Sequence, residues 1–259
     1  VSTQSTGNLM IPLKVKSDCI GCGQCVLQCP TRCLMIKNSK RVYISSENCS
    51  LCGHCFAICP VGAIEIFDQS AEQLKLDLSN LNELETIIAY RRSIRKYEPE
   101  PLPAEELDRL LQFLRFSPQI QDPRRSRLFL LQRGAMDELG AMIALEMSGQ
   151  FPKLPQQQNQ LDIVFRGAPH CLVIVCSSKE EEDDGVIALT QIELLAQSTG
   201  VGTFWAGMLK IQGNKSDPIK ARMGVPTDMY ISGCIALGKP ALKYKRSVGR
   251  IPYHIDVVE

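Results

Sequence analysis

The chain has 259 residues, enough for two compact domains, and 44% of them are hydrophobic, which suffices for buried cores. The formal net charge of +1 excludes an overall electrostatic attraction to nucleic acid or to an anionic membrane surface. The longest apolar runs are far shorter than the roughly 20 residues of a membrane helix, and the first residues lack a signal-peptide core. Together with the charge, these features predict a protein that binds neither membrane nor nucleic acid, and with the many cysteines they favour a reducing cytoplasm.

Two cysteine runs with identical spacing lie in the first 60 residues. Cys19 to Pro30 and Cys49 to Pro60 both read C-x2-C-x2-C-x3-C-P, and each cysteine of the second run lies thirty positions after its counterpart. A 4Fe-4S cube needs four thiolates that converge from different directions, and one tight loop delivers only three of them. The doubled run therefore predicts two 4Fe-4S clusters, against the alternatives of structural zinc or a set of disulfides.

These runs resemble those of bacterial two-cluster ferredoxins over residues 10–68. In runs of this type the fourth cysteine binds the other cluster. The two expected ligand sets are Cys19, Cys22 and Cys25 with Cys59, and Cys49, Cys52 and Cys55 with Cys29. We interpret Cys33 as a packing residue and His54 as a surface residue, because four cysteines already complete each set.

Residues 69–79 are expected to form a linker, and a second domain is expected over residues 80–259. Asn80, with Glu83 three positions later, is a capping pattern that predicts a helix to about Arg91. The apolar residues of that helix that we expect to face inward are Leu84, Ile87 and Ile88.

Further helices and strands alternate along the rest of the chain. Helices are predicted from Pro103 to about Leu114, over 135–147 and over 186–198, and strands over 127–132, 171–176 and 229–237. Between them, residues 151–160 form a Pro- and Gln-rich loop that is a candidate lid. This alternation predicts an α/β or α+β sandwich.

Four segments of the second domain are similar, in order, to the nitroreductase-type FMN flavoproteins. They are Arg91–Tyr97 (RRSIRKY), Ala168–Val175, Gln191–Gly207 and Met223–Pro240. The third segment carries G-V-G-T-F-W-A-G, which resembles the turn that lies beside the flavin ring in that family. The similarity covers about residues 80–252. It implies an α+β fold in which a ferredoxin-like domain precedes an FMN domain.

The resemblance also implies which residues contact FMN. In that family the arginines and serine of the first segment reach the phosphate and the flavin edge, and guanidinium groups suit a phosphate bidentately. A backbone N–H of the third segment reaches flavin N5, and a late basic residue reaches the phosphate. The contacts carried over to this sequence are Arg91, Arg92, Ser93, Arg95, Ser117, Pro118, Ala206, Gly207, Arg246 and Arg250. No catalytic acid or base is identified.

The loop after the second predicted helix departs from the family pattern. The family usually has an Asn and a Gln there, and Asp122 and Arg124 occupy those two positions in this chain. An acid near the flavin would oppose an anionic reduced flavin, whereas Arg124 or Arg125 would stabilise it or bind an anionic substrate.

The expected function is that of a ferredoxin-fused FMN oxidoreductase. Two clusters would pass single electrons to FMN, which would reduce a small organic acceptor such as a nitroaromatic, a quinone or an activated alkene. The expected partners are a second copy in a homodimer and an external electron donor, namely ferredoxin, flavodoxin or NAD(P)H. Two alternatives stay open: a non-catalytic electron-transfer subunit of a larger redox complex, and a flavin-binding sensor or storage protein.

Overall fold

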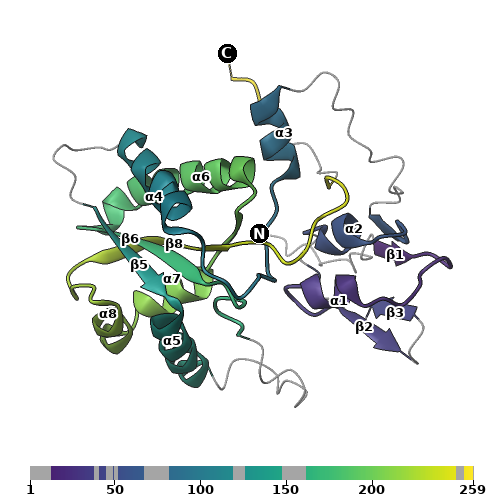
Figure 1. Cartoon of the computed structure of the whole chain (residues 1–259), viewed down its shortest axis with the longest axis horizontal. Coiled ribbons are helices and arrows are strands. Elements are labelled where there is room, and N and C mark those ends of the chain that lie inside the picture. Colours follow the sequence, from purple (N-terminus) through teal and green to yellow (C-terminus); the bar gives the residue numbers. More distant parts are fainter. Residues whose placement is uncertain are drawn as a thin grey trace, which may run out of the picture. The chain divides into compact units, whose positions relative to one another are not determined.

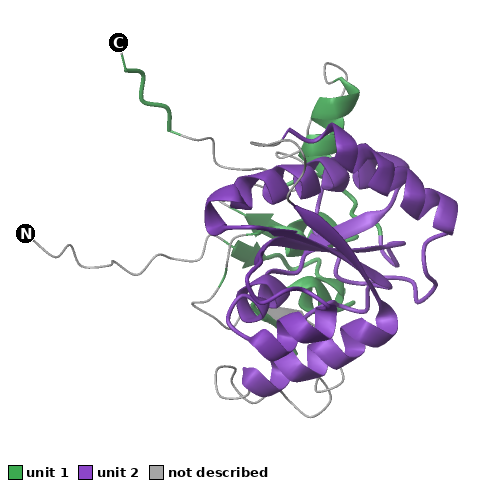
Figure 2. Ribbon diagram, turned by 90° about the vertical axis from the view of Figure 1, so that its left-hand side faces the viewer, with its two compact units in different colours: residues 1–90, 243–259 green, residues 91–242 purple. Residues whose placement is uncertain are grey.

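The structure is a computed structural model that describes residues 13–37, 41–44, 49, 52–66, 82–118, 126–147, 162–248 and 254–258. The chain divides into two compact units (Figure 2), of which unit 1 comprises residues 1–90 and 243–259 and unit 2 comprises residues 91–242. We expected the C-terminal residues to belong to the second domain, whereas their contacts group residues 243–259 with the cysteine-rich N-terminal residues. The predicted boundaries at residues 68 and 80 lie outside the described residues and stay predictions.

Unit 1 repeats one short helix and pairs its strands into two small sheets (Figure 1). The helices are α1 (Gln24–Gln28) and α2 (His54–Ile58), which lie thirty positions apart like the cysteine runs. The antiparallel pairs are β1 (Leu13–Val15) with β4 (Ile64–Ile66), and β2 (Leu34–Lys37) with β3 (Arg41–Ile44). Gly23 and Gly53 precede the two helices with left-handed φ values of 72°, a conformation that suits glycine because it has no Cβ.

Helix α3 (Glu83–Tyr90) begins two residues later than the capping pattern predicted. Its reciprocal cap joins Asn82 and Glu85: the Glu85 N–H donates to Asn82 Oδ1 (2.9 Å), and the Asn82 N–H donates to Glu85 Oε2 (2.8 Å). The sequence contains two overlapping patterns of this kind, so the prediction chose the wrong one; Asn80 itself lies outside the described residues. The predicted inward packing is also wrong for this chain, because Leu84 and Ile88 are each 55% exposed.

The core of unit 2 is an antiparallel sheet with the strand order β5-β6-β8-β7. Its strands are β5 (Arg127–Gln132), β6 (His170–Cys176), β7 (Gly202–Trp205) and β8 (Tyr230–Gly238). Strands β6 and β8 are central and almost wholly buried, as their continuous apolar sequences predicted. Strand β7 was not predicted, because the sequence from Gly200 to Gly207 reads as a turn.

Helices cover both faces of this sheet, so the sandwich prediction is confirmed (Figure 1). On one face lie α4 (Ala104–Gln112) and α6 (Glu182–Thr199), and on the other α5 (Arg133–Glu146), α7 (Gly207–Gly213) and α8 (Asp217–Met223). Helix α6 begins four residues before its predicted start, since the acidic residues Glu182 to Asp184 form its first turn, where the helix dipole favours negative charge. Within the described ranges, no helix is both long and apolar enough to cross a bilayer.

The main hydrophobic core of unit 2 lies between the sheet and the α4/α6 layer. Leu107 and Leu110 of α4 meet Leu189 and Ile192 of α6 over Leu172 of β6. Burying a large aliphatic side chain of this kind contributes roughly 1.5–3 kcal/mol. This layer therefore fixes α6, which also carries the buried Glu193 next to Ile192.

Candidate functional site

The first predicted thiol set meets around the N-terminal end of α1. Burial raises the pKa of the Cys25 thiol to about 12, and the neighbouring Cys59, Cys22 and Cys19 add to that shift. Cys25 comes from α1, whereas Cys59 follows α2, so the close packing of these two helices brings the fourth cysteine to the other three. The structure therefore gathers the four cysteines that the sequence assigned to one cluster.

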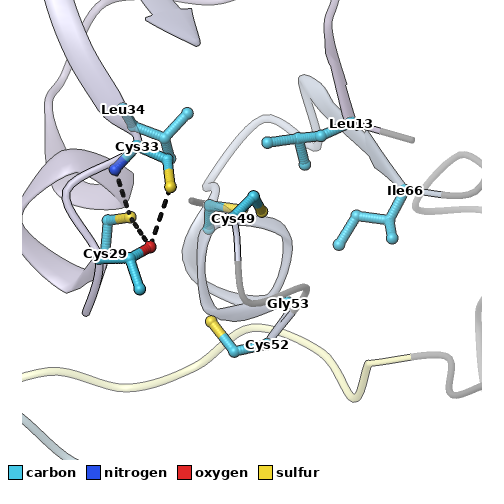
Figure 3. Close-up of a pocket in the computed structure, with 10 residues that line it drawn as sticks. Leu13, Cys29, Cys33, Leu34, Cys49, Cys52, Gly53 and Ile66 are labelled. Atoms are coloured by element: carbon cyan, nitrogen blue, oxygen red, sulfur yellow. Dashed lines mark hydrogen bonds between the residues drawn. The ribbon is translucent and has the colours of Figure 1, made fainter. Parts of the chain in front are cut away.

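The second set lines an apolar pocket (Figure 3). Cys29, Cys49, Cys52 and Cys55 surround it together with side chains that include Leu13, Leu34 and Ile66. The pKa of Cys55 is raised well above its usual value, first by burial and then by Cys52, Cys25 and Cys29. Because Cys25 belongs to the first set, the two sets are close neighbours.

Cys33 is buried and lines the same pocket as the second set (Figure 3). Its Sγ lies 2.9 Å from the Thr31 hydroxyl oxygen, and its backbone N–H donates to Cys29 Sγ (3.1 Å). At the equivalent position of the second repeat, the Ala63 N–H donates to Cys59 Sγ (3.2 Å). Each fourth cysteine therefore receives a backbone hydrogen bond, and such bonds stabilise thiolate and tune a bound cluster.

These two thiol sets fit 4Fe-4S clusters in their chemistry. Thiolates are the ligands that such clusters use, and burial raises the pKa of Cys25 and Cys55, a shift that bound positive iron would oppose. Among the described residues, no group of three or more His, Cys, Asp or Glu is placed to chelate a single metal ion.

His54 does not lie on the surface, so that prediction is wrong. It is 5% exposed, and its ring meets the edge of Tyr244 with the ring centroids 5.7 Å apart. Tyr244 is 190 positions later in the chain, and its packing on α2 could not be inferred from the residues next to His54.

Arg246 also contacts α2, although the sequence suggested it as a phosphate ligand. Its Nη1 donates to the carbonyl oxygens of Phe56 (2.7 Å) and Cys59 (2.8 Å). These partners belong to unit 1 and differ from the flavin contact that we predicted. Arg250, the other late basic residue, lies outside the described residues, and its role stays a prediction.

In unit 2, the predicted flavin-binding segment Arg91–Tyr97 docks beside β7. The Ile94 N–H donates to the Thr203 carbonyl (2.8 Å), and Ser93 forms a parallel bridge with Thr203. Gly202 permits this approach, because a Cβ there would lie 2.7 Å from Ile94 Cγ1. The structure therefore brings together two of the four segments that carry the nitroreductase resemblance.

A buried carboxylate that the sequence analysis missed holds this segment. Glu193 of α6 is 5% exposed; its Oε1 accepts a hydrogen bond from Arg91 Nη1 (3.1 Å), and its Oε2 accepts one from Trp205 Nε1 (3.2 Å). The only sequence signal was a single acid among the apolar residues of a central helix. The neighbouring Arg92 is also buried, and its guanidinium donates to the Arg91 carbonyl (2.7 Å). Arg95 is half-buried.

The two candidate donors for flavin N5 differ in their backbone partners. The Ala206 N–H donates to the Cys234 carbonyl (2.9 Å) and is therefore occupied. Gly207 is the first residue of α7, and first-turn amides have no acceptor within their own helix. Of the two, Gly207 is the better candidate.

The remaining predicted contacts lie at the end of the α4 layer. Ser117 is buried, with its hydroxyl 3.4 Å from the Pro118 carbonyl, and Pro118 is exposed. The departure at Asp122 and Arg124, and the candidate lid over 151–160, lie outside the described residues and stay predictions.

Two family models match separate parts of the chain. The nitroreductase family model matches residues 88–239, more than half of the chain, and a 4Fe-4S dicluster domain model matches residues 18–63. A curated protein of Methanothermobacter thermautotrophicus, provisionally named an NADH dehydrogenase/NAD(P)H nitroreductase, is 26% identical over 170 residues, which are 63% of this chain and 80% of that protein.

Solved nitroreductases share the fold of unit 2. The crystal structure of a nitroreductase with bound FMN from Bacteroides fragilis has a TM-score of 0.56 and 23% identity, and covers 69% of this chain and 100% of its own. A nitroreductase with bound FMN from Desulfitobacterium hafniense also has a TM-score of 0.56, at 21% identity, and covers 68% of this chain and 100% of its own. The chain therefore belongs to the nitroreductase family and carries a 4Fe-4S dicluster domain before the nitroreductase domain.

Proposed function

We propose that this protein is an iron-sulfur flavoprotein that carries two 4Fe-4S clusters and FMN and reduces a small organic acceptor. The observation that carries the proposal is the convergence of eight motif cysteines into two neighbouring thiol sets, in the same chain as a nitroreductase domain. When bound, the clusters supply one-electron transfer, and FMN links it to two-electron reduction of the acceptor. Acceptors of this kind are nitroaromatics, quinones and activated alkenes.

The residues of unit 2 include groups that suit FMN. Arg91 and Arg95 supply positive charge for the phosphate, and Ser93 supplies a hydroxyl beside them. The Gly207 N–H, at the positive end of α7, is the donor proposed for N5. The FMN that is bound in the Bacteroides fragilis and Desulfitobacterium hafniense structures supports this choice of cofactor.

We also propose that the protein is a homodimer that receives electrons from ferredoxin, flavodoxin or NAD(P)H. The exposure of Leu84 and Ile88 on α3 supports a second copy, because two large apolar side chains on one helix face gain stability when they are covered. Residues 244–248 pack on α2 of their own chain, so this part of the C-terminal segment is not offered to the second copy.

The test is anaerobic purification followed by iron, sulfide and flavin determination and a turnover assay. We expect about eight irons and one FMN per chain, together with reduction of a nitroaromatic by dithionite-reduced ferredoxin or NAD(P)H. Zinc in place of iron, or the absence of flavin, would overturn the proposal. Full cofactor content without turnover of any of the three acceptor classes would favour the electron-transfer subunit over the enzyme.

A further inference from the structure

The segment Lys243–Val248 is an integral part of the cluster-binding unit. The Lys245 N–H donates to the Ala57 carbonyl of α2 (2.9 Å), and the Tyr244 hydroxyl lies 3.4 Å from Gln28 Oε1 of α1. Val248 packs against Gly53, where a Cβ would overlap it. The segment therefore touches both cysteine-bearing helices.

Arg246 occupies the C-terminal end of α2. The last carbonyls of a helix have no partner within the helix and carry partial negative charge, so a guanidinium there is favourable. Arg246 binds two of these oxygens, those of Phe56 and Cys59, and its guanidinium carbon lies 5.6 Å from the centre of the Phe56 ring. Cys59 is itself one of the expected cluster ligands.

Arg246 gives the Cys59 carbonyl a second donor, beyond the hydrogen bond that the two repeats share. In the first repeat, the Cys29 carbonyl accepts the Arg32 N–H (3.4 Å), and in the second the Cys59 carbonyl accepts the Gly62 N–H (3.4 Å) in the same way. The Cys59 carbonyl accepts the Arg246 guanidinium in addition. The duplicated motif does not encode this donor, which comes from a segment near the other end of the chain.

A fixed positive charge at this place affects a cluster through its redox change. Reduction adds one negative charge to a cluster, and a nearby cation in a poorly solvated site stabilises the reduced state more than the oxidised state. The Arg246 side chain is partly buried and tied to two acceptors, so its charge stays close to Cys59. Lys245 is exposed, and solvent screens its charge.

We propose that Arg246 is a positioning residue that raises the reduction potential of the cluster held by Cys19, Cys22, Cys25 and Cys59. The proposal rests on the proposed function, because it requires that this thiol set holds a cluster. The reduction potential of this cluster then depends on a residue that lies outside both cysteine motifs.

The test is an EPR-monitored redox titration of the reconstituted full-length chain and three variants. We expect Arg246→Gln to lower the ratio of reduced to oxidised cluster about tenfold at a fixed potential, a shift of about 59 mV for a one-electron couple. Arg246→Lys, which keeps the charge, should change the ratio less than about threefold, and the matched control Lys245→Gln should change it less than about twofold. The shift should be larger for one of the two clusters.

Two results would overturn the inference. One is a wild-type ratio in Arg246→Gln, and the other is an equal shift in Lys245→Gln. If Arg246→Gln does not retain its iron, Arg246→Lys decides, because a tenfold shift with the charge preserved contradicts an electrostatic role and an unchanged ratio supports it. A wild-type chain without iron would overturn the proposed function itself, whereas a fully loaded wild type without these shifts overturns only the role of Arg246.

Discussion

Replacing Glu193 with Gln should loosen the contact between the Arg91–Tyr97 segment and helix α6. Both carboxylate oxygens of Glu193 accept hydrogen bonds, one from Arg91 and one from Trp205. An amide oxygen can keep the bond from Trp205, but the negative charge that holds the Arg91 guanidinium is lost. The substitution therefore isolates the ion pair from the rest of the site.

The expected loss follows from the burial of the two partners. Hydrogen bonds to charged groups contribute roughly 1.5 to 3 kcal/mol, but the Arg91 side chain is 29% exposed, so solvent screens part of the interaction. We expect Glu193→Gln to lower the free energy of unfolding by about 1 to 2 kcal/mol. For a domain of this size, this corresponds to a fall in melting temperature of about 2 to 8 °C.

Trp205 is the only tryptophan in the chain, and it contacts Glu193, so its fluorescence reports the unfolding of unit 2 directly. Thermal unfolding of the FMN-free protein, Glu193→Gln, Arg91→Ala and the double variant forms a thermodynamic cycle. We expect a coupling energy of about 1 to 2 kcal/mol between the two residues. Strictly additive effects, or a Glu193→Gln melting temperature within about 1 °C of wild type, would refute the reasoning.

The same variants test the predicted phosphate contact. Arg91 has donors beyond the one that binds Glu193, so it can serve both groups. Arg91→Ala should weaken FMN binding by about one to two decades, as measured by flavin titration, without changing the iron content. If Arg91→Ala binds FMN as tightly as wild type, the phosphate contact is refuted, whereas the ion pair between Arg91 and Glu193 is not affected by this result.

Three further predictions test other parts of the molecule. Burial lowers the pKa of His170, so the unfolded chain binds more protons and the free energy of unfolding should decrease as the pH falls below about 6.5; urea titrations at several pH values should show this decrease, and His170→Gln should lose it. Gly53→Ala should force a Cβ against Val248 at a left-handed φ of 72°, so we expect this variant to bind less iron than wild type; an unchanged iron content would contradict this packing. Cys22→Ser should leave about four irons per chain, whereas Cys33→Ser should keep about eight, and equal losses would contradict the ligand assignment.

The sequence alone determined the two thiol sets, because the spacing of cluster ligands is a local chemical requirement. A tight loop can present three thiolates only at short, regular intervals. The resemblance to two-cluster ferredoxins, in which the fourth cysteine binds the other cluster, implied how the two runs combine. The central strands were also predictable, with β6 and β8 starting or ending within about one residue of expectation. A strand that is buried on both faces must be apolar at nearly every position, and that pattern is visible without a fold.

Strand β7 and the cap of α3 were less well determined by the sequence. Gly202 and the residues around it read as a turn, and they form a strand because β8 offers a pairing edge and Ile94 needs the space that a side chain would fill. Two overlapping capping patterns precede α3, and their spacing is equivalent, so local sequence could not choose Asn82.

Only the tertiary structure decided the partners of Arg246, Glu193 and His54. Arg246 and Phe56 are 190 positions apart, and Arg91 and Glu193 are 102 positions apart, so nothing near either residue in sequence specifies the pair. An arginine or a glutamate suits many partners, and its role depends on which distant element the packing brings to it. The folding of residues 243–248 against α1 and α2 placed a cation beside Cys59, an expected cluster ligand, where sequence resemblance had suggested a phosphate.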